Sequence, residues 1–344
     1  MSNETFPLWN LPQIPRKLVF QLIDIIDLLE ISMTSRPVRK FLTAFKPHLV
    51  DLTWKFDDSQ AIRRYRVVGP PPYETYMYLQ LYFPFSKQEI TYYFVGKNKA
   101  RSSQERAVNW KEDVVMKCMD KREMYERQGF MVGGRDDCRR ADPGNPDLKI
   151  MEDLSTHLTQ ILRINSFNVK HLRLSEFDFF GCFVWNITRK FKKFVAKNVE
   201  INKEATRFIL NDLEIEDVEI MKNCKWISMD DVMESESKKI KIRFPNDMNV
   251  DELVKLVNLW KSGNILRDMK SLSLEGPFDV EKMLLQEHYR LKFFKKLGTI
   301  GKRSDRNVFE NDIKRDTDGQ MARLFFCGRQ MTLDLKEATE KKVN

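Results

Sequence analysis

Four histidines and five cysteines are the side chains best suited to metal binding or nucleophilic catalysis. They are His48, His157, His171 and His288, with Cys118, Cys138, Cys182, Cys224 and Cys327. Such chemistry places its residues at short, fixed spacings, as in His-x-x-Glu-His or Cys-x-x-Cys. Neither spacing occurs in this sequence. We therefore expect no catalytic residue, no metal and no cofactor.

The cysteine pattern also bears on the compartment. An odd number of widely separated cysteines is typical of free thiols in a reducing environment, so we expect a cytoplasmic or nuclear protein. No apolar stretch approaches the roughly 20 residues that a membrane-spanning helix needs. We expect no membrane partner.

Two further segments bear a superficial likeness to ligand-binding loops. Residues 298–304 carry Gly298 and Gly301-Lys302, but a phosphate loop has four residues between its glycines and a Ser or Thr directly after the Lys. The acidic residues of 136–147 lack both the spacing and the closing Glu of a calcium loop. The sequence therefore does not predict an enzyme.

The net charge of +9, from 59 basic and 50 acidic residues, raises the question of a polyanionic partner. Two basic clusters stand out, one within residues 290–306 and one made of Arg189, Lys190, Lys192, Lys193 and Lys197. Phe191 and Phe194 interrupt the latter, and basic residues mixed with aromatics can bind nucleic acid. The same two phenylalanines, three residues apart, equally fit core positions beneath a solvated basic face. A basic repeat protein that binds nucleic acid, with residues 1–46 as a helical cap, is the alternative hypothesis.

The elements that position these residues change along the chain. In the first fifty residues, apolar side chains recur at helical spacing in three short runs. The first contains Leu18 and Leu22 and opens near Pro15, the second covers residues 27–33, and the third begins at Ser35, a good helix cap. So small a unit rarely buries its apolar residues alone, which indicates a docking surface.

The middle of the chain reads as strands followed by a linker. Residues 64–68, 76–83 and 90–95 are rich in Tyr, Val and Phe and are separated by Gly- and Pro-rich turns, which favours strands. Residues 97–150 are charged and end in a segment rich in Gly, Pro and Asp, which is typical of a linker.

From residue 151 helical and strand-like segments alternate. Short strands are predicted at 169–174, around Phe194, and at 218–220, 240–244 and 272–274, with a helix at 250–260 that ends before Gly263. This period favours an irregular leucine-rich-repeat-like domain, with an ordinary α/β domain equally compatible. Asp318-Gly319 between two strand-like runs predicts a closing hairpin. The predicted fold class is α+β or α/β.

The N-terminal pattern resembles an F-box of the type expanded in nematodes. The resemblance covers residues 6–46 and rests on an ordered set of short motifs: Phe6-Pro7-Leu8, Leu11-Pro12, Leu18-Val19, Asp27-Leu28-Leu29, Ile31-Ser32 and Ser35-Arg36. Residues 165–335 are similar to the F-box-associated domain of these families. That second resemblance rests on residues 226–232, 240–243, 254–264, 269–274 and 311–326. Together the two resemblances divide the chain into an F-box (5–48), a β-rich and linker region (50–150) and an F-box-associated, leucine-rich-repeat-like domain (151–335).

The resemblance implies an adaptor without catalytic activity of its own. It would be the substrate-recruiting subunit of a Skp–cullin–F-box E3 ubiquitin ligase, with a Skp-type adaptor, and through it a cullin, bound at one end and an unidentified protein target at the other. The implied contact residues for the Skp-type adaptor are Phe6, Pro7, Leu8, Leu11, Pro12, Leu18, Val19, Leu22, Leu28, Leu29 and Ile31. We expect Leu11 and Pro12 to be the foremost of these, since a Leu-Pro pair supplies an apolar side chain and fixes the path of the chain.

Overall fold

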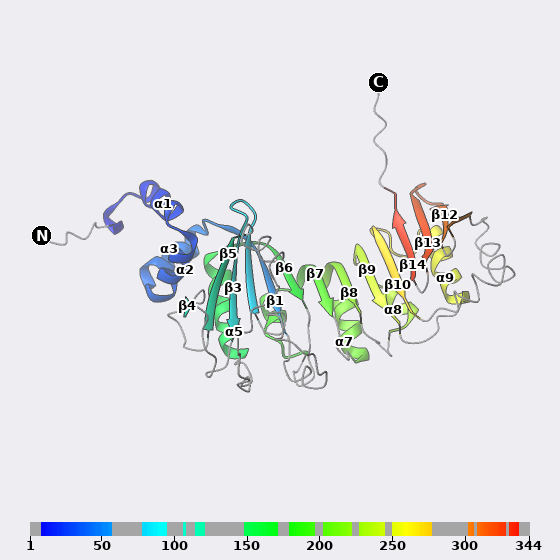
Figure 1. Cartoon of the computed structure of the whole chain (residues 1–344), viewed down its shortest axis with the longest axis horizontal. Coiled ribbons are helices and arrows are strands. Elements are labelled where there is room, and N and C mark those ends of the chain that lie inside the picture. Colours follow the sequence, from blue (N-terminus) through cyan, green and yellow to red (C-terminus); the bar gives the residue numbers. More distant parts are fainter. Residues whose placement is uncertain are drawn as a thin grey trace, which may run out of the picture. The chain divides into compact units, whose positions relative to one another are not determined.

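The computed structural model describes residues 8–56, 78–94, 106–107, 114–120, 148–170, 179–196, 202–221, 227–244, 250–276, 302–305, 308–327 and 330–336. The chain forms two compact units, Met1–Asn168 and Val169–Asn344. Each unit combines helices with β-strands (Figure 1). The prediction of a mixed α and β protein with three N-terminal helices is confirmed.

Unit 1 (Met1–Asn168) opens with helices and continues into strands. The helices are η1 (Leu8–Asn10), α1 (Gln13–Leu22), α2 (Ile25–Thr34), α3 (Arg36–Phe45) and α5 (Leu148–Ile161). The strands are β1 (Leu49–Lys55), β2 (Tyr78–Phe83), β3 (Gln88–Phe94), β4 (Arg106–Ala107), β5 (Val114–Asp120) and β6 (Arg163–Lys170). We refer to η1 through α3 as the helical module.

Local sequence signals start the helices of the module. The Asp24 carboxylate accepts a hydrogen bond from the backbone N–H of Ile26 at 2.8 Å and caps α2. The Ser35 hydroxyl caps α3 by accepting one from Val38 at 3.5 Å. These caps satisfy backbone donors that a helix N-terminus leaves without a partner. The predicted Ser35 cap and the three predicted helices are therefore found.

The strands of unit 1 lie in the order β6-β1-β2-β3-β5-β4, and neighbours from β1 to β4 are antiparallel. Strands β4 and β5 fall within the region 50–150, which the sequence division describes as β-rich with a linker. Strand β5, which the sequence does not single out, pairs with β3 along its whole length, from Gln88 opposite Asp120 to Phe94 opposite Val114. The predicted strand at 64–68 lies outside the described residues.

Helix α5 packs on one face of β1. Val50, Leu52 and Trp54 alternate along the strand and are all buried, so they share a face. The Trp54 indole Nε1 donates a hydrogen bond to Ser155 Oγ on α5 at 2.9 Å. The same ring stacks on Phe167 of β6, with the ring centroids 5.5 Å apart. Helix α5 and most of β6 therefore belong to unit 1, whereas the sequence division places them in 151–335.

Unit 2 (Val169–Asn344) alternates helices and strands and then ends in strands. Its helices are α6 (Val184–Ile187), α7 (Lys203–Arg207), the π-helical turn η4 (Phe208–Asp212), α8 (Met229–Met233) and α9 (Val250–Lys261). Its strands are β7 (Lys190–Ala196), β8 (Glu214–Ile220), β9 (Lys239–Arg243), β10 (Ser271–Glu275), β11 (Lys302–Asp305), β12 (Val308–Lys314), β13 (Met321–Cys327) and β14 (Gln330–Leu335).

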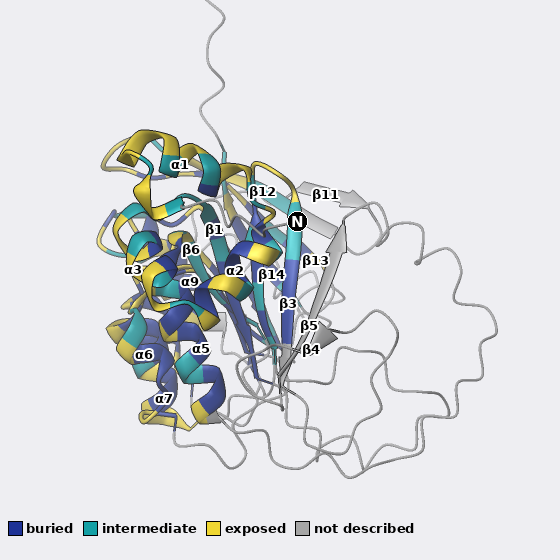
Figure 2. Ribbon diagram, turned by 90° about the vertical axis from the view of Figure 1, so that its left-hand side faces the viewer, coloured by how far each residue is buried: buried dark blue, intermediate teal, exposed yellow. Residues whose placement is uncertain are grey.

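Strands β7, β8, β9 and β10 are parallel and lie side by side in chain order. Beyond β10 the sheet becomes antiparallel, in the order β14, β13, β12 and β11. Helices α7 and α9 lie on one side of these strands (Figure 2). The predicted strands near Phe194 and at 218–220, 240–244 and 272–274 are all present.

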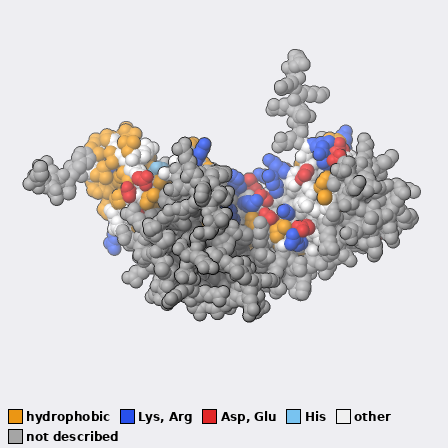
Figure 3. All heavy atoms as spheres, viewed as in Figure 1, with side chains coloured by type: hydrophobic (Ala, Val, Ile, Leu, Met, Phe, Trp, Pro, Cys, Tyr) orange, Lys and Arg blue, Asp and Glu red, His pale blue; other side chains and the backbone are white. Residues whose placement is uncertain are grey.

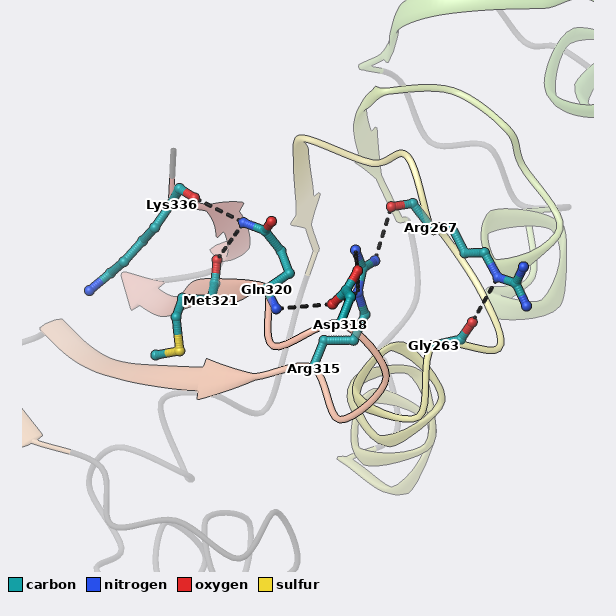
Figure 4. Close-up of polar contacts among 7 residues, drawn as sticks. All are labelled: Gly263, Arg267, Arg315, Asp318, Gln320, Met321 and Lys336. Carbon is teal, nitrogen blue, oxygen red and sulfur yellow. Dashed lines mark hydrogen bonds and ion pairs between the residues drawn. The ribbon is translucent and has the colours of Figure 1, made fainter. Parts of the chain in front are cut away.

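A polar network fixes the hairpin between β12 and β13 (Figure 4). The buried Arg315 guanidinium donates to both oxygens of Asp318, to the carbonyl of Arg267 at 2.9 Å, and lies over the Trp260 ring. The Asp318 carboxylate also accepts the backbone N–H of Gln320 at 2.9 Å. The hydrogen bonds from Arg315 and Gln320 lower the pKa of Asp318 to about 2. The network ties the predicted hairpin to the loop that follows α9.

Gly263 ends α9 in a left-handed conformation, with a φ of 72°. Its N–H donates to the carbonyl of Trp260 and that of Asn264 to the carbonyl of Leu259, which is the Schellman arrangement. The sequence predicts this helix end correctly. A Cβ at position 263 would overlap the Thr317 side chain, lying 2.7 Å from its Cγ2.

We expect Gly263→Ala to destabilise unit 2 by about 1–2 kcal/mol, because alanine is strained at this φ and meets Thr317. Urea unfolding of the full chain, followed by a probe in unit 2, measures the loss. In the Thr317→Ala background the overlap is reduced, so the same glycine substitution should cost less. An equal cost in both backgrounds would contradict the steric part of this explanation.

Candidate functional site

The outer face of α1 carries a row of exposed aliphatic side chains. Ile14, Leu18 and Leu22 are 73%, 55% and 85% exposed. Their spacing of four residues puts them on one side of the helix, along roughly 12 Å of its axis. We call these three residues the α1 stripe.

The helical module exposes further apolar residues outside α1. Trp9 of η1 and Ile31 of α2 are also exposed. Together with the α1 stripe they are five of the eight large apolar side chains that are exposed among the described residues. The space-filling view shows hydrophobic atoms gathered over the module (Figure 3). An exposed concentration of this kind marks an interaction surface more often than chance exposure.

The opposite face of α1 is apolar as well and packs inside the module. Phe20 is buried, and its ring stacks on Phe41 of α3, with the centroids 4.7 Å apart. The Lys17 ammonium lies over the ring of Phe45, 5.0 Å from its centroid. Helix α1 therefore uses one face to join α3, and the α1 stripe remains exposed.

The residues predicted to contact a Skp-type adaptor fall into four groups. Leu18, Leu22, Ile31 and Pro12 are exposed, and Leu8, Leu11 and Val19 are partly exposed. Leu28 and Leu29 are buried inside unit 1, where they pack with the neighbouring helices instead of facing outward. Phe6 and Pro7 lie outside the described residues. The structure thus brings most of the predicted set to the module surface and assigns two leucines to its interior.

Side-chain hydrogen bonds join helix α5 to the helical module and the residue that follows it. His157 of α5 and Ser32 of α2 form a buried hydrogen bond of 3.0 Å. The Ser32 hydroxyl gives its single proton to the carbonyl of Leu29 at 2.6 Å, so His157 Nε2 is the donor in this pair. Lys46 Nζ adds a hydrogen bond to the carbonyl of Thr159 at 3.0 Å. The module is thus joined to the rest of unit 1 by side chains as well as by the chain itself.

The electrostatic environment keeps His157 neutral. Burial away from water, and then the nearby positive charge of Arg39, lower its pKa to about 4. Arg39 is itself held by the carbonyls of Ser32 and Met33, at 3.2 and 3.0 Å. Burial also lowers the pKa of His48. Both histidines act as neutral structural residues at physiological pH.

Two of the five residues of the basic cluster around β7 are paired with acids. Lys190 meets Glu214 at 2.7 Å and Lys193 meets Asp217 at 3.1 Å, both on the neighbouring strand β8. Phe191 and Phe194 are buried core residues, which is the second of the two interpretations given above. Lys197 and most of residues 290–306 lie outside the described residues.

Cross-strand pairing of charges extends over the parallel strands of unit 2. Lys238 bonds to Glu216 at 2.9 Å, and Arg243 on β9 bonds to Glu275 on β10 at 2.7 Å. Basic residues on β7 and β9 thus face acidic residues on β8 and β10 in register. This arrangement stabilises the strand order and reduces the positive potential that a polyanion would need.

In the described residues no three His, Cys, Asp or Glu side chains come together in a way that could hold a metal ion. Within the same ranges no helix is long and apolar enough to cross a membrane. Several residues considered in the sequence analysis lie outside the described residues, and what the sequence predicts for them stays a prediction: His171, His288, Gly298, Gly301 and the acidic residues of 136–147.

Sequence reasoning missed Ile14, Trp9 and Arg16. Ile14 could have been found, because residues 14, 18 and 22 repeat at intervals of four while Phe20 points elsewhere. A helix that is apolar on two sides needs two partners. Arg16 contacts η1 and α3, and such tertiary contacts cannot be predicted from the spacing of residues in the sequence.

Comparison with protein-family models, with curated proteins and with solved structures gives no match.

Proposed function

We propose that the chain is the substrate-recruiting subunit of a Skp–cullin–F-box E3 ubiquitin ligase. The helical module binds a Skp-type adaptor, and through it a cullin, while the rest of the chain holds a protein target. The observation that carries this proposal is the exposed α1 stripe of Ile14, Leu18 and Leu22. It lies on the same three-helix module whose motifs resemble an F-box.

The size of the stripe suits a protein interface that needs further contacts. Burying one Leu or Ile side chain contributes about 1.5–3 kcal/mol, whereas association costs several kcal/mol in lost freedom. Trp9, Leu11 and Pro12 precede α1 and are exposed or partly exposed, and we propose that they supply further contacts with the adaptor. Exposed prolines and aliphatic residues next to an aromatic ring are a suitable surface for the helices of an adaptor.

The mechanism is proximity. An adaptor that carries a target raises the effective concentration of the target near the ubiquitin-transferring enzyme, without contributing a reacting group. The buried hydrogen bond between Ser32 and His157 and the exposed one between Lys46 and Thr159 support this role, because they join the module to α5 of unit 1.

The second part of the proposal concerns unit 2. We interpret its parallel strands β7 to β10, with helical segments between them, as an irregular leucine-rich-repeat-like arrangement. Its role is to bind the target protein. Hydrogen-bonding and paired charged side chains on these strands favour a folded protein partner over nucleic acid, since Lys190 and Lys193, two of the three lysines of β7, are already paired with acids.

The proposal predicts that the purified full chain and a purified Skp-type adaptor migrate as a complex on a sizing column. Binding should change little between about 50 and 500 mM salt, because an apolar interface is not screened, whereas phosphate neutralisation loses affinity steeply. Titration calorimetry at both salt concentrations measures this. Separate migration of the two proteins would refute the adaptor function, and salt-sensitive binding to RNA or DNA would support the alternative.

A further inference from the structure

Arg16 connects three parts of the helical module. Its Nη2 donates to the carbonyl of Trp9 at 2.7 Å and to the carbonyl of Leu11 at 2.6 Å. Its guanidinium also lies over two rings, 5.4 Å from the centroid of Trp9 and 5.8 Å from that of Phe41. One side chain of α1 thus contacts the preceding turn on two carbonyls and reaches α3 as well.

Besides Arg16, a backbone hydrogen bond and the ring contacts of Trp9 support this turn. In η1 the N–H of Leu11 donates to the carbonyl of Leu8 at 3.3 Å. Trp9 is 40% exposed, and its ring packs at the edge of Phe20 and Phe41, with centroids 6.1 and 6.2 Å away. A three-residue 3₁₀ turn does not persist by itself in water. Arg16 therefore supplies much of the order of residues 8–11.

We propose that Arg16 is a positioning residue that presents Trp9, Leu11 and Pro12 to the partner of the helical module in a single arrangement. This inference rests on the proposed function, and it adds a role to a residue that need not touch the partner. Without Arg16 the turn samples many conformations, and only a fraction is competent to bind. The apparent affinity then falls by that fraction.

This role has a kinetic signature. When only a fraction of the free protein is competent, the association rate falls by that fraction and the dissociation rate of the formed complex changes little. A residue that contacts the partner behaves in the opposite way, since its loss mainly speeds dissociation. Leu18→Gln, on the α1 stripe, provides the contact case for comparison.

The test uses the full chain with Arg16→Gln, and Arg36→Gln as the matched control. Arg36 is an exposed arginine at the start of α3, so the control removes the same charge from the same module. Surface-immobilised Skp-type adaptor gives both rate constants. We expect Arg16→Gln to lower the association rate about tenfold with dissociation unchanged within twofold, and Arg36→Gln to leave both rates as in the wild type.

Hydrogen exchange of the free chain provides the second readout. The amide of Leu11, bonded to the carbonyl of Leu8, should exchange at least about tenfold faster in Arg16→Gln, while the amide of Ile23, bonded to the carbonyl of Val19, should keep its protection. An effect confined to dissociation, or unchanged exchange at Leu11, would overturn the inference. If the wild type binds no adaptor, the proposed function fails, and the exchange comparison still decides whether Arg16 orders the turn.

Discussion

Replacing Leu18 and Leu22 together by glutamine is expected to weaken binding of a Skp-type adaptor by at least about a hundredfold. Each leucine contributes about 1.5–3 kcal/mol when it is buried in an interface, and each 1.4 kcal/mol corresponds to a factor of ten in affinity. The two glutamine amides would also lose water on binding without gaining a fixed partner. Titration calorimetry with the full chain measures the change.

The fold should tolerate this double substitution. Both side chains are more than half exposed in the free protein, so little packing is lost. Glutamine and leucine have similar helix propensities. The circular dichroism spectrum and the unfolding midpoint should therefore stay close to those of the wild type, which separates a lost contact from a lost fold.

Two further variants sharpen the interpretation. Phe85 lies on the turn between β2 and β3 and is 85% exposed, like Leu22, so Phe85→Gln tests whether any exposed apolar residue matters. We expect it to bind as the wild type does. Leu29→Ala, in the buried interior, should instead cost about 2–5 kcal/mol of stability. Normal binding by the Leu18, Leu22 variant would exclude the α1 stripe as the adaptor surface.

Acidification is expected to destabilise unit 1 through His157. The pKa of this histidine is about 4 in the folded chain, whereas an unfolded histidine has a pKa of about 6.5. Between these values the unfolded state binds a proton that the folded state does not, so stability falls as the pH falls from 6.5 to 4. From pH 7 to pH 5 the loss amounts to about 2 kcal/mol.

His157→Gln isolates this contribution. A glutamine amide can still donate to Ser32 Oγ, but it does not titrate. His48, whose pKa is also lowered, remains in both proteins and cancels in the comparison. Urea unfolding at pH 7 and pH 5 should show a loss in the wild type that exceeds the loss in the variant by about 2 kcal/mol. An equal loss in both proteins would show that His157 is protonated without cost.

The helices and parallel strands follow closely from the sequence because their signals are local. Ser35 caps α3 by bonding to a backbone N–H three residues later, and Gly263 ends α9 because it adopts a left-handed conformation readily. The short strands around Phe194 and at 240–244 and 272–274 show their apolar alternation within a few residues. These features form from the local sequence and do not depend on contacts with distant parts of the chain.

Features that depend on distant partners were predicted less well. Strand β5 has several charged and polar neighbours and no strong turn signal, and it becomes a strand by pairing with β3. Helix α5 joins unit 1 because its Ser155 and His157 meet Trp54 and Ser32, more than 100 residues earlier in the chain. A local sequence pattern does not indicate strand pairing or side-chain packing between residues that are so far apart in the chain.

The sequence by itself determined the existence of an apolar three-helix module at the N-terminus, because helical periodicity and capping residues are encoded within each turn. Only the tertiary structure decided which of its leucines are available. Leu28 and Leu29 look no different from Leu18 and Leu22 in the sequence, yet α2 is packed within unit 1 and α1 faces outward along Ile14, Leu18 and Leu22. Burial is a property of the assembled helices, and it separates the residues that hold the module together from those left to bind a partner.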